Sequence, residues 1–275
     1  MGMRVWRAGV LCVALSVSLV EAQTPAQDGR PVAVEPGAWQ IVVLANQARA
    51  ASGAGPLKWD PALAEAARRH CLRMAEEGEI AHRYGGEPDV TSRAGQAGAH
   101  FSLIEENVAV GPDPYTIHDA WMHSAGHRAN LLNPEVDRVG VALVASRGTL
   151  YAVADYGRAV AVLTQAEVEA AIARLIHAAG VAVLRDPTDA RAACEMDRGM
   201  PATLSGAEPR FVMRWQEADL SQLPKPLSER LATGDYRTAA VGSCAPQNVE
   251  GAFTVYRVAV LLYAAPSTQD GKRIY

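Results

Sequence analysis

The stretch Trp121-Met-His-Ser-Ala-Gly-His-Arg-Ala-Asn-Leu-Leu-Asn-Pro134 gathers an aromatic anchor, two histidines, a hydroxyl, an arginine and two amides beside apolar residues. The residue before a proline is disfavoured in the helical region, so a helix in this stretch should end at Asn133. Polar groups that converge beside apolar walls favour a cleft. The alternative is a helix end whose polar groups cap their own backbone.

The composition of the 275-residue chain excludes some functions. Hydrophobic residues make up 49% of it, which is enough for a core, and the length fits one or two domains. The formal net charge of −4 gives no electrostatic footprint for nucleic acid. No apolar run after residue 25 is long enough to span a bilayer, so we expect no integral membrane segment in the mature chain.

The first 22 residues predict a secretory signal peptide. Arg4 and Arg7 precede an apolar run over residues 8–20, and small residues at Val20 and Ala22 mark a cleavage point after Ala22. The run is short for a membrane anchor, and the residues before Cys12 lack the small residue of a lipoprotein signal. We therefore expect a secreted protein, extracellular or periplasmic.

Export into an oxidising compartment favours a disulfide. Cys71, Cys194 and Cys244 follow the predicted cleavage point. Cys194 and Cys244 lie in the same half of the chain and are the predicted pair. Cys71 lies within a predicted helix among apolar neighbours and is expected to be a small buried hydrophobe.

Local signals divide the first part of the chain into a flexible lead-in at residues 23–37 and a domain that ends near Ala159. Asp60 and Pro61 begin a helix that ends at Gly78, with His70 on its apolar face as a buried structural histidine. The other expected elements are helices over 39–51 and 115–121, a surface loop over 84–99, and a strand hairpin over 139–144 and 150–156.

The remaining residues, 160–275, predict a small α+β module. Apolar spacing indicates a helix over 165–179, and strands are expected over 211–215, 239–244 and 253–263. The order of strand, turn and aromatic-rich strand weakly resembles residues 139–156. This raises the hypothesis of a degenerate structural repeat in which the second copy lacks the polar chemistry of the first.

Three residues at the ends of elements are candidates for chemistry: His82, Glu106 and His127. Two histidines and a carboxylate can bind a divalent metal such as zinc, and they can also act as general acid and base near neutral pH. Two weaker patterns exist. His123 and His127 have a metal-pair spacing interrupted by Gly126, so His123 is expected at the surface. Ser124 and His127 could form a nucleophile and its base, but the Gly-x-Ser-x-Gly nucleophile elbow is absent.

The motifs of residues 38–159 resemble the CAP superfamily of cysteine-rich secretory, antigen 5 and pathogenesis-related proteins, in its bacterial SCP-like extracellular branch. The resemblance runs in unbroken order through these segments: 57–63, 67–70, Met74, His82, 106–109, 121–132, 139–141 and 151–156. It implies a three-layer α–β–α sandwich with an open cleft, followed here by the α+β module. It does not extend to residues 160–275.

The resemblance also implies site residues. Eukaryotic members carry two histidines and two acids that can hold zinc in the cleft. His82 matches the first histidine and Glu106 the first acid, whereas Ser124 stands where the second acid would fall. The second histidine, expected near residues 137–139, is missing, and His127 is typical of the bacterial branch. With Asn107, these residues are the expected cleft set.

Three functions follow as hypotheses. The first is a secreted binding module whose cleft holds a small apolar ligand such as a lipid or sterol, a cell-wall fragment or a protein partner. The second is a metal-assisted hydrolase with Glu106 as base and His82 and His127 as ligands or acid–base groups. The third is a structural hydrogen-bond network of the same residues. Whether the chain is an enzyme stays open at this stage.

Overall fold

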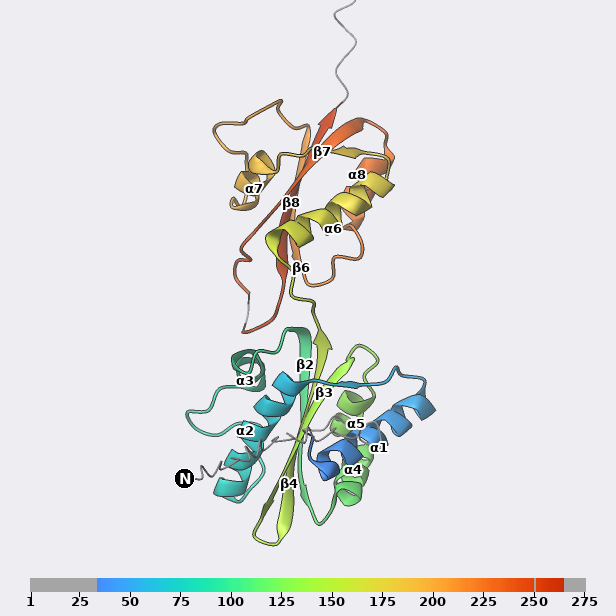
Figure 1. Ribbon diagram of the computed structural model, residues 1–275, viewed down its shortest axis with the longest axis vertical. Helices are drawn as coiled ribbons and strands as arrows, with labels where there is room; N and C mark the ends of the chain where they lie inside the picture. Colours follow the sequence, from blue (N-terminus) through green and yellow to red (C-terminus); the bar gives the residue numbers. More distant parts are fainter. Residues whose placement is uncertain (1–33, 250, 265–275) are drawn as a thin grey trace, which may run out of the picture. The chain divides into compact units, whose positions relative to one another are not determined.

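The computed structural model describes residues 34–249 and 251–264, so the predicted signal peptide lies outside the described residues. It shows two four-stranded sheets, each with helices of its own (Figure 1). The elements of the first sheet and its helices are α1 (Pro36–Ser52), β1 (Lys58–Trp59), α2 (Pro61–Glu77), α3 (Val90–Gln96), β2 (Phe101–Gly111), α4 (Pro114–His123), α5 (Ala125–Leu132), β3 (Arg138–Ser146) and β4 (Thr149–Ala159).

The first sheet has the strand order β1-β3-β4-β2. β1 runs parallel to β3, and the other neighbours are antiparallel. The predicted hairpin is confirmed as β3 and β4, which are joined at Arg147 and Gly148. The φ angles of these two residues, 51° and 79°, are positive, as a two-residue hairpin turn requires.

Helices cover both faces of this sheet, which confirms the expected three layers. On one face, Val108, Ala142 and Val153 pack against Cys71 and Met74 of α2. The other face carries α1, α4 and α5 (Figure 1). Asp60 caps α2 as predicted, because its side chain accepts bonds from the backbone N–H groups of residues 62 and 63.

Two expectations about this half were wrong. The lead-in does not extend to residue 37, because Glu35 caps a helix that begins at Pro36 and accepts bonds from the next backbone N–H groups. The predicted loop over residues 84–99 contains α3, which Asp89 caps through the N–H of Ser92. The polar, loop-like composition of this stretch gave no signal for the short helix. Its residue Arg93 is buried.

The second sheet is built from α6 (Gln165–Ala178), β5 (Ala182–Val183), α7 (Thr188–Cys194), β6 (Phe211–Glu217), α8 (Lys225–Ala232), β7 (Tyr236–Cys244) and β8 (Tyr256–Ala264). The predicted helix and three strands of this half are confirmed. Buried residues of α6 and α8 pack on one face, together with Val241 and Val260. Ala190 and Cys194 of α7 pack on the other, with Ala240 and Leu261.

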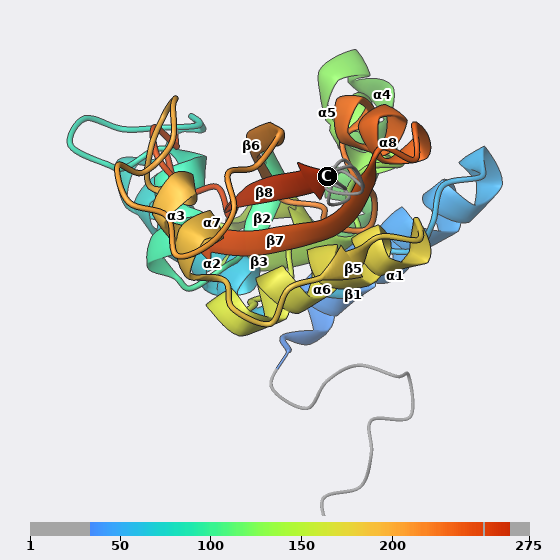
Figure 2. The same cartoon turned by 90° about the horizontal axis from the view of Figure 1, so that it is seen from above.

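The second sheet repeats the topology of the first. Its order is β5-β7-β8-β6, with β5 parallel to β7 and the other pairs antiparallel. Figure 2 shows β7 and β8 side by side, with α6 next to β5. The long helix α2 on one face of the first sheet corresponds to the short helix α7 here. The weak pattern in the sequence therefore reflects the same order of strands and layers.

Two glycines mark equivalent points of the two sheets. A methyl group on Gly140 of β3 would lie 2.0 Å from the backbone N of Ala64 in α2. A methyl group on Gly242 of β7 would lie 2.2 Å from the backbone N of Arg191 in α7. Each helix backbone therefore touches its sheet where a strand has no side chain.

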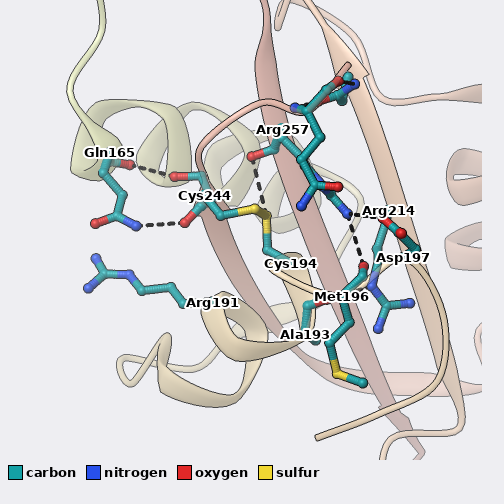
Figure 3. Close-up of a disulfide and its surroundings, with 12 residues drawn as sticks. Gln165, Arg191, Ala193, Cys194, Met196, Asp197, Arg214, Cys244 and Arg257 are labelled. Carbon is teal, nitrogen blue, oxygen red and sulfur yellow. Dashed lines mark hydrogen bonds and ion pairs between the residues drawn. A yellow bond between two sulfur atoms is a disulfide. The ribbon is translucent and has the colours of Figure 1, made fainter. Parts of the chain in front are cut away.

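The predicted disulfide is confirmed: Cys194 and Cys244 are joined, with their Cα atoms 5.8 Å apart (Figure 3). Cys71 is free and buried, and burial raises the pKa of its thiol to about 12, so it is a buried hydrophobe as expected. Across residues 34–249 and 251–264, every helix is too short or too polar to pass through a bilayer.

Candidate functional site

The site of the first sheet is centred on Glu106 of β2. Its carboxylate is 4% exposed and has a partner on each oxygen. His82, in the loop after α2, places Nδ1 2.8 Å from Oε1. Arg93 of α3 donates from Nη2 to Oε2. Two of the predicted residues, His82 and Glu106, are thus brought together, and a buried arginine holds the carboxylate from the other side.

His82 is the exposed member of this group, with 60% of its side chain accessible to solvent. The hydrogen bond to Glu106 raises the pKa of His82 above its ordinary value, against the effect of burial and of Arg93. Because Nδ1 faces Glu106, Nε2 is the ring nitrogen left for an external group, and it has no hydrogen bond within the described part of the chain.

A second layer of contacts holds the His82 loop in place. His70 is fully buried, as predicted for a structural histidine, and its two ring nitrogens lie 2.7 Å from Glu87 Oε1 and 2.8 Å from the carbonyl of Ala81. Arg93 Nη1 lies 3.8 Å from Glu87 Oε1 and donates to the carbonyl of His82. His70, Glu87 and Arg93 therefore fix the backbone on both sides of the His82 side chain.

Asp155 of β4 is a buried acid directly beside Glu106. The two residues are paired across the β2–β4 ladder. Asp155 is fully buried, and neither of its oxygens receives a donor from the described residues. Burial, followed by the charge of Glu106, raises the pKa of Asp155 well above its ordinary value. Both effects favour the neutral, protonated form of Asp155 over its carboxylate.

His127 of α5 is half-buried near His82. Burial lowers the pKa of His127, and the charge of His82 lowers it further. No hydrogen bond of the His127 ring is present in the described part of the chain. Its backbone carbonyl accepts a bond of 2.9 Å from Asn107 Nδ2.

Asn107 and Ser124 take roles different from those expected of cleft residues. Asn107 is fully buried and points to the opposite face of the sheet from Glu106, where it bonds α5 and accepts from Asn130 Nδ2 at 3.0 Å. It fixes α5 against β2. Ser124 joins α4 to α5 and has no side-chain capping bond. His123 is 77% exposed, as expected of a surface residue.

The donor set does not fit the predicted metal site. Both oxygens of Glu106 already face cationic or hydrogen-bonding partners, and within residues 34–249 and 251–264 no three His, Cys, Asp or Glu side chains are grouped to hold a metal ion. Zinc binding by His82, Glu106 and His127 stays a prediction.

Sequence reasoning missed Arg93, Glu87 and Asp155. Asp155 had a signal, because it is a lone acid inside the apolar strand sequence Tyr-Ala-Val-Ala-Asp-Tyr. A charged residue at such a position is rarely fully buried without a partner. Arg93 and Glu87 had none, since both lie in a polar stretch that resembles a surface loop.

Comparisons with known proteins agree on the first half of the chain. Residues 43–156 match the family described as "CAP: Cysteine-rich secretory protein family". The uncharacterized protein YkwD of Bacillus subtilis is 33% identical over 111 residues, which are 39% of this chain and 42% of YkwD. The uncharacterized membrane protein YlbC of the same organism is 33% identical over 106 residues, 37% of this chain and 30% of YlbC.

The match thus covers less than half of either relative. Among solved structures, an extracellular protein containing an SCP domain from Bacillus anthracis is 26% identical. That similarity has a TM-score of 0.42 and covers 44% of this chain and 40% of the other.

Proposed function

We propose that residues 43–156, which match the cysteine-rich secretory protein family model, form a CAP domain that acts as a secreted binding module. The ligand contacts the exposed His82 and the neighbouring His127, and it is a small apolar molecule, a cell-wall fragment or a protein partner. Glu106, Arg93 and Asp155 hold the site from below and do not contact the ligand.

The occupied carboxylate of Glu106 carries this proposal. A general base or a metal ligand must be within reach of its substrate or ion, whereas the Glu106 carboxylate is 4% exposed and is held by His82 on one oxygen and by Arg93 on the other. The same bonds leave His82 Nε2 directed outward on a fixed ring. A fixed donor or acceptor at an exposed position suits recognition of a ligand that carries a polar group.

A binding experiment tests this function. The full-length chain is titrated with a fluorescent fatty acid, a fluorescent sterol and soluble peptidoglycan fragments. We expect saturable binding of one of these probes, weakened about tenfold or more by His82→Ala, which removes a directed contact. His123→Ala is the matched control, because it removes an exposed histidine that takes no part in the network. Equal binding by the parent and His82→Ala would overturn the proposal.

Zinc titration distinguishes the metal-assisted hydrolase. Stoichiometric zinc binding that is lost in both His82→Ala and His127→Ala would replace the binding module with a metal site. Secretion is tested separately by mass analysis of the exported chain, whose expected first residue is Gln23.

A further inference from the structure

The short helix of the second sheet leaves part of one face without helical cover. α2 has 17 residues and extends over Val108, Ala142 and Val153 of the first sheet. α7 has 7 residues and ends at Cys194. A shallow cavity of about 290 Å³ that is wide open to solvent lies beyond its end, lined by these residues: Asp197, Arg214, Trp215, Gln216, Gln247, Asn248 and Arg257.

Two arginines on adjacent strands face this cavity. Arg214 of β6 pairs with Ala259, and Arg257 of β8 pairs with Gln216, so the two arginines are diagonal neighbours in the ladder. Arg214 donates to the carbonyls of Ala193 and Gly199, each at 2.5 Å. Arg257 donates from Nη2 to the carbonyl of Met196 at 3.0 Å. Figure 3 shows both side chains on the α7 side of the sheet, beside the disulfide.

The positive charge of this pair is only partly balanced. Arg257 is 7% exposed, and its carboxylate partner Asp197, at 3.2 Å, is 83% exposed. Asp197 is the one acid that forms an ion pair with either arginine in residues 34–249 and 251–264. Burial and the like charge of Arg257 lower the pKa of Arg214. Glu195 lines an adjoining cavity with Arg257 and forms no ion pair with it in that part of the chain.

The cavity also has fixed polar walls. Gln216 donates to the carbonyl of Gln247 at 2.8 Å and accepts from its N–H at 2.6 Å, which ties the loop after β7 to the edge strand β6. The Nε and Nη1 groups of Arg257 have no hydrogen bond within the described residues. Guanidinium donors that backbone carbonyls hold in place are suited to bind carboxylate or phosphate oxygens.

We propose that Arg214 and Arg257 form a binding site for an oxyanion, a carboxylate or phosphate group, and that Asp197 occupies this site when no ligand is bound. The external anion displaces the exposed Asp197 carboxylate and balances the second arginine. This site is independent of the His82 site in the first half, since it uses other residues and another sheet.

Calorimetric titration of the full-length chain tests the site. The probes are inorganic phosphate, N-acetylalanine and its neutral amide. We expect saturable binding of phosphate, N-acetylalanine or both, and none of the amide; which anion binds identifies the source of the oxyanion. Arg257→Gln should weaken binding at least about tenfold, because it removes a buried charged donor. Arg185→Gln, an exposed arginine outside the cavity, should leave binding unchanged.

Asp197→Asn is the deciding variant. Asp197 is exposed, so the substitution should not disturb folding, and loss of the competing carboxylate should tighten anion binding several-fold. Mass analysis of the Cys194–Cys244 disulfide and far-UV circular dichroism check that Arg257→Gln is folded. No saturable binding of either anion, equal binding by a folded Arg257→Gln, or weaker or unchanged binding by Asp197→Asn would overturn the proposal.

Discussion

The two sheets share one topology but differ at the same row of residues. In the first sheet this row is Gly140, Asp155 and Glu106, on neighbouring strands. In the second it is Gly242, Ala259 and Arg214. The glycine is retained because a helix backbone touches the strand there. The acid pair is replaced by a small residue and a cation.

This difference shows that the fold and the site depend on different residues. Strand order and layers need only apolar alternation and a glycine under the helix. The His82 network needs Glu106, Asp155 and the extra helix α3, which the second sheet lacks. The second sheet fixes its short helix α7 with the Cys194–Cys244 bond and the Arg214 contact to Ala193.

The largest expected effect is that of breaking the acidic centre of the first sheet. Glu106→Gln should lower the free energy of unfolding by about 3–5 kcal/mol, because Arg93 then stays buried without its carboxylate. Chemical denaturation measures the loss. Glu105→Gln is the control, since its Oε1 accepts a bond from Asn133 that glutamine can also accept. Equal losses in the two variants would contradict a network centred on Glu106.

The corresponding change in the second sheet is removal of the disulfide. Replacing both Cys194 and Cys244 by alanine should lower the free energy of unfolding by about 2–4 kcal/mol, since the bond closes a loop with a sequence separation of 50. Thermal unfolding with and without a reductant measures this. In the parent, a reductant should have the same effect. A variant as stable as the oxidised parent would show that α7 is fixed by packing alone.

The glycine pair tests whether the two sheets are equivalent in packing. Gly140→Ala and Gly242→Ala should each lower the free energy of unfolding by about 1–3 kcal/mol, because the added methyl group meets the backbone of α2 or α7. Gly55→Ala, in a loop with open space around it, is the control. If only Gly140→Ala is destabilising, α7 can move away from its sheet. The two sheets are then not equivalent in packing at these glycines.

The smallest effect, and the one that depends on pH, concerns Asp155. Its raised pKa, caused by burial and by Glu106, means that the folded chain holds a proton that the unfolded chain releases above about pH 4. The free energy of unfolding therefore falls as the pH rises above that value, until Asp155 ionises in the folded chain. Asp155→Asn should be more stable than the parent at pH 7 by roughly 1 kcal/mol.

Denaturation at pH 7 and pH 4 tests this sign. The difference between Asp155→Asn and the parent should shrink at pH 4, where the acid is protonated in both states. A variant that is less stable than the parent at pH 7 would show that Asp155 is ionised in the folded chain and pairs with Arg93. In that case the first sheet would carry an ionised acid at the position where the second sheet carries the uncharged Ala259.

Local signals predicted much of the secondary structure. Asp60 with Pro61 predicted the start of α2, the apolar spacing of residues 165–179 predicted α6, and two apolar runs joined by Ser146-Arg-Gly148 predicted β3 and β4. Each of these depends on groups a few residues apart, which the sequence places together whatever the fold. The same reasoning failed for α3, because a capped helix of seven residues in a polar stretch has no apolar stripe to reveal it.

The sequence by itself determined the Asp60 cap, the apolar strand and helix patterns, the disulfide partners and, through the family resemblance, the expectation that His82 and Glu106 share one cleft. The tertiary structure decided which face each residue occupies. It placed Arg93 and Asp155 against Glu106, turned Asn107 to the other face, and left Ser124 outside the network. The reason is that burial and charge balance arise between segments distant in the chain, and one residue of register reverses the direction of a side chain.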